Sequence, residues 1–581
     1  MHRMLLFAFL TGFSLGPLLL AQMSRAPTTT SAMGASRCIV DVPSDHTDST
    51  GSTYVPMDSW LYPAMDRLHA LGYVDAAFLG MRPWTRLNIL HRLQETGDKI
   101  VAHPEDEVAR DIFTAVCKEL SHETQAQGGK AEPHATLESL YSNFRGISGT
   151  PLRDSYHLGQ TIINDYGRPY QQGFNDYSGW NARGEYGRFS LYFRGEYQHA
   201  PSATGYSEGL SQILSNIDQV PYESNVIQDT IPQGPIPAAN PFRIMEATVS
   251  YHLLGHEISF GKNDHWLGPA KGGSMGWGTN AENIYAFEIN RTEPFRIPWL
   301  SRLTGPLRYD FYVGSLKGHT YPNDPWVHVE KISFKPSRNL ELGFERTVIW
   351  GGKGHVPITI HSFLKSFFSF QNVSLAEKYS REDPGARFGS FDFNYRLPLV
   401  RSWLSLYSDS EAHDDVNPIS APRRAAVRPG IYLSHFPRAH AFDLRVEGAS
   451  SDPVSDESLN GNFLFYEAIQ KQGTTNKGFL FTDWIGRDAK GGQAWLTYHL
   501  SANESVQWMY RNAKADHNFI PFGTTQNDFE VSVVKRIGKQ TELRGWVQQE
   551  EWKAPIYKPG RQSNTMASGQ ITWYLTHGKQ F

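Results

Sequence analysis

Apolar and polar side chains alternate along most of the chain after about residue 154. In one run, Phe189, Leu191 and Phe193 share one face, whereas Ser190 and Arg194 lie on the other. The same two-residue period recurs at 442–447, 506–511 and 571–576. This is the period of a β-strand that has one apolar and one polar face. The pattern therefore predicts a long succession of two-faced strands.

The lengths of the connections decide between two all-β architectures. A β-sandwich also has alternating strands, but an outer-membrane barrel joins its strands by short periplasmic turns and long external loops in turn. Short turns are expected at 187–188, 255–256, 336–339, 397–400, 437–440, 501–503 and 537–539. Long loops are expected at 199–240, 265–282, 351–385, 410–425, 451–490, 514–526 and 550–565. We therefore predict a transmembrane antiparallel β-barrel of about eighteen strands over residues 154–581.

The segment before the strands has a helical period instead. Leu61, Met65 and Leu68 recur at helical spacing in a first helix that Gly72 can end. A second helix is expected over 83–97, and a third after Pro104. Such amphipathic helices need a surface to cover their apolar stripes. We predict that residues 56–123 form a periplasmic plug or dock at the barrel mouth, followed by a linker over 124–153.

The first residues have the features of an export signal. Arg3 precedes an uncharged apolar run from Leu5 to Ala21, which is typical of a secretory signal peptide. We expect residues 1–21 to be removed, with cleavage as late as residue 35 as an alternative, and residues 22–55 to form a disordered leader. A retained membrane anchor is a second alternative, although glycines and a proline interrupt the run. The expected location is the outer membrane.

Composition narrows the function classes. The chain has a net charge of −4, and 13 % of its residues are aromatic, as expected of a barrel with aromatic girdles at both membrane interfaces. No basic face is evident, so nucleic acid is not an expected partner. The two cysteines, Cys38 and Cys117, form either a single disulfide or two separate thiols.

Several short motifs, in order along the chain, resemble those of one protein family. They are YVPMDSWLYPAMDRL at 54–68, LGY at 71–73, RPWTR at 82–86, GKNDHWLGP at 261–269, GGS at 272–274, ELGFERTVIWGGKG at 341–354 and FDFNYRLP at 391–398. Together they resemble the Wzi family of capsule assembly proteins. The resemblance implies an outer-membrane barrel, capped by helices on its periplasmic side, that acts as a lectin for capsular polysaccharide. It implies surface polysaccharide, outer-membrane lipid, the barrel assembly machinery and polysaccharide export proteins as partners.

The best local candidate for a sugar site follows a strand expected to run outward. Lys262, Asn263, Asp264 and Trp266 combine the donors, acceptors and stacking ring that a sugar needs. The alternative is that this segment folds into the lumen and satisfies its own backbone. Trp350 and Lys353 end another outward strand, where Trp350 can also be an interface aromatic before a turn.

No catalytic, cofactor or metal motif is present. The segment 268–274 lacks the Gly-Lys-Ser/Thr end of a phosphate loop, and metalloprotease, dinucleotide-binding and Cys-x-x-Cys patterns do not occur. We expect a non-enzymatic protein without cofactor or metal. Two alternatives stay open: a substrate-selective porin, and a barrel hydrolase whose groups meet only in space. Charges of both signs on the inward faces indicate ion pairs that fill the lumen or line a channel.

Overall fold

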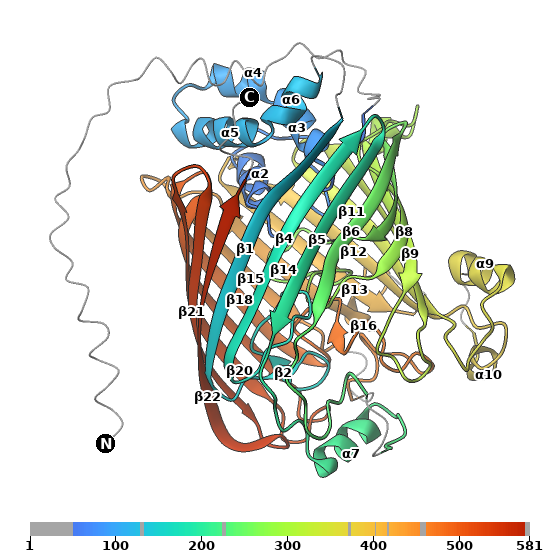
Figure 1. Ribbon diagram of the computed structural model, residues 1–581. Helices are drawn as coiled ribbons and strands as arrows, with labels where there is room; N and C mark the ends of the chain where they lie inside the picture. Colours follow the sequence, from blue (N-terminus) through green and yellow to red (C-terminus); the bar gives the residue numbers. More distant parts are fainter. Residues whose placement is uncertain are drawn as a thin grey trace, which may run out of the picture.

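A computed structural model describes residues 50–127, 133–223, 228–369, 373–400, 402–414, 418–453 and 460–575. Its main feature is one antiparallel sheet of 18 strands, rolled into a barrel (Figure 1). The strands are β1 (His134–Gly149), β4 (Gly173–Tyr186), β5 (Phe189–His199), β6 (Phe242–Leu253), β7 (His256–Lys262), β8 (Tyr285–Arg291), β9 (Leu307–Ser315), β10 (Trp326–Ser337), β11 (Leu340–Trp350), β12 (Ala386–Arg396), β13 (Leu404–His413), β14 (Ala425–Leu433), β15 (Phe442–Ser450), β18 (Ala489–Ser501), β19 (Glu504–Ala515), β20 (Thr525–Ile537), β21 (Thr541–Ala554) and β22 (Lys558–Tyr574).

The barrel closes between its first and last strands. β1 pairs with β22 on one side and with β4 on the other, so that Tyr141 lies opposite both Thr572 and Gly179. Each later strand pairs with the next strand of the sheet. Closure leaves no sheet edge unpaired, which is the condition for strands to cross a bilayer. The predicted barrel and its strand number are confirmed.

Side chains along each strand face the lumen and the outside in turn. On β5, Phe189 and Leu191 are exposed on the outer face, whereas Ser190 and Arg194 are buried inside. Exposed outward rings and aliphatic side chains recur around the wall, for example Phe260, Ile332 and Phe344. An apolar outer face and a polar inner face are the arrangement of a transmembrane barrel. Among the described residues, no helix combines the length and apolarity needed to cross a membrane.

Two strand boundaries differ from the sequence prediction. The first strand begins at His134, inside the predicted 124–153 linker, and not near residue 154. Leu140 and Phe144 of this strand face outward, and they alternate with Tyr141, Asn143 and Arg145, which face inward. The apolar period is hard to see in the sequence, because a tyrosine faces inward and Ser142 faces outward.

The predicted long loop over 550–565 is also wrong. β21 and β22 continue through this segment and are separated only by residues 555–557. The outward side chains there, including Glu551, Lys553 and Arg561, are polar and exposed. Without apolar outward side chains, the two-residue period is invisible in the sequence, although the backbone stays in the ladder.

Short helices precede the barrel and lie across one of its mouths (Figure 1). They are α2 (Leu61–Ala70), α3 (Arg86–Gln94), α4 (Gly97–Ala102), α5 (Glu107–Glu119) and α6 (Ser121–Gln127). The predicted second helix over 83–97 is shorter. It begins at Arg86, because the Thr85 hydroxyl accepts a hydrogen bond from the backbone N–H of Asn88 and caps α3. We call residues 50–127, which contain these helices, the helical plug. Residues 50–55 belong to it and not to the predicted disordered leader, since Tyr54 and Val55 are buried.

The helical plug contacts the barrel rim where the strand connections are short. The Gly51 amide donates to the Gly187 carbonyl at 2.8 Å, Arg67 to the His440 carbonyl at 2.7 Å, and Arg396 to the His69 carbonyl at 2.8 Å. These carbonyls and guanidinium groups join the plug to three separate places on the rim. The plug therefore covers the mouth at the short-turn end.

Long segments from the opposite rim fold into the lumen. Residues 150–172, with β2 (Arg153–Asp154) and β3 (Gly159–Gln160), lie largely buried there, as do 263–284 and 463–488, with β16 (Thr475–Asn476) and β17 (Phe479–Leu480). A hydrophobic cluster joins Trp277 and Phe481 of these segments to Met81 of the plug and Tyr312 of the wall. The lumen is thus filled by protein.

Further helices lie outside this core. They are α7 (Glu208–Ile217), α8 (Ser301–Thr304), α9 (Ile360–Phe368), α10 (Leu375–Lys378) and the 3-10 turn η1 (Pro422–Arg424). α9 packs on the outer surface of the wall, where the Phe367 and Phe311 rings are 5.8 Å apart. Arg346 donates to the Phe367 carbonyl at 2.7 Å and so satisfies the end of this helix.

The export signal, most of the leader and Cys38 lie outside the described residues. Cys117 is buried on α5. Because Cys38 lies outside the described residues, its pairing with Cys117 stays a prediction.

Candidate functional site

β7 contains a glycine one residue before its end. Gly261 has a φ of +147°, and a Cβ there would lie 2.0 Å from the Ala247 carbonyl oxygen of the neighbouring strand. Only glycine fits this backbone. From Lys262 onward the chain stays buried almost without a break as far as Ile284.

Three predicted sugar-binding residues have protein partners in the lumen. Lys262 forms an ion pair with Glu282 and donates to the Ile244 carbonyl at 2.6 Å. The Asn263 amide donates to Glu288 Oε2 at 3.3 Å, and Asp264 accepts from the Asn283 amide. Burial raises the pKa of the Asp264 carboxyl to about 7. None of these three side chains lies at the outer surface, since each is at most 7 % exposed.

Trp266 joins the same segment to the helical plug. Its backbone amide and carbonyl pair with those of Arg82, with 3.1 Å between nitrogen and oxygen in both directions. Its indole N–H donates to the Ala270 carbonyl at 2.9 Å, and the side chain is buried. The ring therefore has the contacts of a packing residue inside the barrel.

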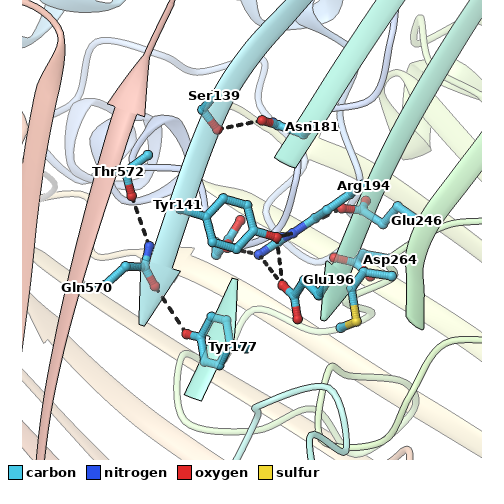
Figure 2. Close-up of polar contacts among 12 residues, drawn as sticks. Ser139, Tyr141, Tyr177, Asn181, Arg194, Glu196, Glu246, Asp264, Gln570 and Thr572 are labelled. Atoms are coloured by element: carbon cyan, nitrogen blue, oxygen red, sulfur yellow. Dashed lines mark hydrogen bonds and ion pairs between the residues drawn. The ribbon is translucent and has the colours of Figure 1, made fainter. Parts of the chain in front are cut away.

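An ionic cluster beside Asp264 ties the plug to the wall. Arg194 donates to Asp58 of the plug at 2.8 Å. It also donates to the Tyr141 hydroxyl at 2.8 Å (Figure 2). Tyr141 in turn donates to Glu196 Oε1 at 2.7 Å. Burial alone would raise the pKa of the Asp58 carboxyl, but Arg194, Arg544 and Arg168 together outweigh burial and lower it.

The remaining two predicted site residues lie elsewhere. Trp350 ends β11 on the outer face, where it is covered by α9 and lies 5.8 Å from the Phe363 ring. Lys353 is on the surface: its side chain is 75 % exposed and pairs with Asp324 at 2.6 Å. The six predicted residues therefore do not meet in one site. Four are in the lumen, one is under a helix and one is at the long-loop surface.

Paired charges fill the rest of the lumen. Arg428 binds Asp483 at 2.5 Å and Glu447 at 3.2 Å, with all three side chains fully buried. Lys331 binds Asp392 at 2.7 Å. Since these charges are satisfied by protein groups, they stabilise the filled interior and do not form a row of free charges along a pore.

Sequence reasoning missed the aromatic side chains that the loop end does expose. Phe522, in the turn after β19, is 81 % exposed, and Tyr379, after α10, is 64 % exposed. Their loops lack any strand period, so the only sequence signal is a ring among polar residues. At the opposite end, Trp299 is 86 % exposed in the connection that contains α8.

Comparisons with known proteins agree with this architecture. The family model described as capsule assembly protein Wzi matches residues 143–567. A Klebsiella pneumoniae relative, described as an uncharacterized 55.8 kDa protein in the cps region, is 28 % identical over 160 residues, which cover 27 % of this chain. The match spans only 31 % of that relative.

Solved structures show the fold. Escherichia coli Wzi, described as a carbohydrate-binding outer membrane β-barrel involved in group 1 capsule assembly, superposes with a TM-score of 0.63 and 15 % identity, over 90 % of this chain and 99 % of that one. At this identity the likeness concerns the fold alone. Pseudomonas aeruginosa OprD gives a TM-score of 0.38 at 9 % identity, over 76 % of this chain and 95 % of that one, which is too low to support an argument.

Proposed function

Because the chain belongs to the Wzi family of capsule assembly proteins, we propose that it is a non-enzymatic outer-membrane protein that holds capsular-type polysaccharide at the cell surface. The relatives support this role: one is described as a carbohydrate-binding barrel, and another comes from a cps region. The proposed partners are the polysaccharide, outer-membrane lipid, the barrel assembly machinery and polysaccharide export proteins.

The observation that carries the proposal is the filled lumen. Loops from one rim meet the helical plug from the other, and Trp266 and Arg82 join them. In the part of the chain that the structure describes, these segments occupy the lumen, and this argues against the porin alternative. The surface formed by the long loops is the part left for contact with a polymer.

The proposed orientation follows from the lengths of the connections. Outer-membrane barrels have short periplasmic turns and long external loops. The helical plug lies at the short-turn end, so we place it in the periplasm (Figure 1). The described residues 200–223, 228–241, 351–369, 373–385 and 516–524 then face the exterior.

Sugar contacts on that surface would come from exposed rings and charges. Phe522 and Tyr379 offer faces for stacking on a sugar, and Lys353 is an exposed donor. Each such contact contributes roughly 1 kcal/mol. A polymer with many repeats then gains avidity from weak contacts. A ligand role for Lys262, Asn263, Asp264 or Trp266 requires residues 263–284 to leave the lumen.

Retention of polysaccharide on cells tests the proposal. Encapsulated cells that lack the protein should release polymer into the medium, and the intact chain should restore retention. Phe522→Ala with Tyr379→Ala should retain less, whereas Trp299→Ala, which removes an exposed ring at the other end, should behave as the intact protein. Equal retention with and without the protein would refute the role.

A further inference from the structure

Three potential metal ligands meet inside the barrel. His265 comes from the segment after β7, Glu288 from β8 and Asp310 from β9, and each is at most 4 % exposed. Each offers one ligand atom, and these atoms all lie within 4.8 Å of one another. The cluster thus joins an inward-folded segment to two strands of the wall.

Two polar atoms of this cluster lack hydrogen-bond partners. His265 Nε2 has none, although it faces Glu288 Oε1 at 3.5 Å, and Asp310 Oδ1 has none either. A buried polar atom without a partner costs about 1–3 kcal/mol. A metal ion would accept electron pairs from His265 Nε2 and Asp310 Oδ1 and so satisfy both atoms.

The nearby arginine does not fill this role. Arg308 donates to the carbonyls of Met81 at 3.1 Å and Pro83 at 3.2 Å, and to the Asn290 side-chain oxygen at 3.0 Å. Its guanidinium is thus committed to the plug and to Asn290, while the carboxylate oxygens of Asp310 receive no hydrogen bond from it.

The surrounding side chains hold the cluster in position. Glu288 accepts hydrogen bonds from Ser259 at 2.9 Å, Asn290 at 3.2 Å and the Tyr54 hydroxyl at 3.3 Å. The His265 ring stacks on Tyr312, with centroids 4.1 Å apart. Partners of this kind orient the ligands of protein metal sites.

We propose that His265, Glu288 and Asp310 bind one divalent transition-metal ion, with Zn²⁺ as the best fit. One imidazole nitrogen and carboxylate oxygens suit Zn²⁺, whereas Mg²⁺ and Ca²⁺ prefer oxygen ligands alone. The ion neutralises two buried carboxylates and links residues 263–284 to β8 and β9. This role is structural and is independent of polysaccharide binding.

Two other histidine–carboxylate clusters show what distinguishes this one. His157 also lies between two buried carboxylates, but Asp154 and Asp218 occupy its two ring nitrogens at 3.1 and 2.9 Å. Near His122, Glu123 is already neutralised by Arg86 and Arg183. In both clusters protein groups satisfy the charge that a metal would otherwise neutralise.

Metal content after controlled refolding tests the proposal. The full chain, unfolded in denaturant with a chelator, is refolded in detergent with Zn²⁺ or with the chelator, desalted, and assayed by plasma mass spectrometry. We expect about one Zn²⁺ per chain and a higher temperature of the heat-induced gel shift. Asp310→Asn and Glu288→Gln should lower Zn²⁺ affinity at least tenfold, whereas His122→Gln should retain it.

Cobalt gives a readout that needs no variant. Co²⁺ bound to the intact protein should show visible absorption bands that Zn²⁺ abolishes, because both ions compete for the same nitrogen and oxygen ligands. Absence of Zn²⁺ and of Co²⁺ bands in the refolded intact protein would overturn the proposal. So would Zn²⁺ binding that is unchanged in a folded Asp310→Asn variant, or that disappears in His122→Gln.

Discussion

Trp266 and Arg82 pair through both backbone hydrogen bonds, each with 3.1 Å between nitrogen and oxygen. One belongs to a segment that enters the lumen from the long-loop rim, and the other to the helical plug at the short-turn rim. Their pairing joins residues 263–284 to the helical plug inside the barrel.

The intact protein should conduct poorly when it is reconstituted in a planar bilayer. Ion flow requires a continuous aqueous path, and the described segments 150–172, 263–284 and 463–488 occupy the lumen together with the plug. Single-channel recording is the measurement, with an open porin of similar strand number as the reference. A large and steady conductance would favour the porin alternative.

Trp266→Ala should both destabilise the barrel and raise its leak. Removal of a buried tryptophan side chain costs roughly 3–5 kcal/mol, and the cavity lies beside the junction with Arg82. The temperature of the heat-induced gel shift and the frequency of conductance events report the two effects. Trp299→Ala is the matched control, because that ring is 86 % exposed. Equal effects of the two substitutions would show that Trp266 has no special part in the seal.

Arg428→Met should destabilise the protein strongly. It leaves the Asp483 and Glu447 carboxylates buried without their cation, which costs roughly 3–5 kcal/mol. Arg561→Met is the control, since Arg561 and Glu551 form an exposed pair whose side chains are 76 % and 52 % accessible. Loss of an exposed pair changes stability by about 0–1 kcal/mol. Thermal unfolding in detergent measures both, and a tolerated Arg428→Met would contradict the proposed role of the ion pairs.

Stability should fall as the pH rises through about 9 because of His157. Burial alone would lower the pKa of this imidazole, but the Asp154 and Asp218 carboxylates outweigh burial and raise it to about 9. The folded state therefore holds a proton that the unfolded chain releases near pH 6.5. The stabilisation is complete below pH 6.5 and is lost as the pH approaches and passes 9.

The measurement is thermal unfolding between pH 6 and 10. The intact protein should lose stability across this window, and His157→Gln should flatten this part of the profile. His517→Gln is the control, because the His517 side chain is 74 % exposed. A profile that His157→Gln leaves unchanged would contradict the assignment.

Much of the barrel could be predicted because each strand meets lipid on one face and a polar interior on the other. β5 shows this clearly, with Leu191 outside and Arg194 inside. The period disappears where that contrast ends. At the tips of β21 and β22, Glu551 and Arg561 point outward but stay exposed, so the segment has the composition of a loop.

The candidate site was less predictable, because its partners are remote in sequence. Lys262 and Asp264 have the chemistry of sugar ligands, but Glu282 and Asn283 already occupy them. Whether a Gly-rich loop projects outward or folds inward depends on such distant contacts. Local composition cannot distinguish the two cases.

The pairing of β1 with β22 closes the barrel wall, and this closure also keeps the segments inside the lumen in contact. Residues 263–284 enter the lumen from one rim, and Arg82 belongs to a segment at the other rim. The two meet inside the closed barrel. Without the pairing of β1 with β22, the flank between these strands would be open, and we expect the interior to be accessible from the side. The pairing of the first and last strands therefore completes the wall around the interior.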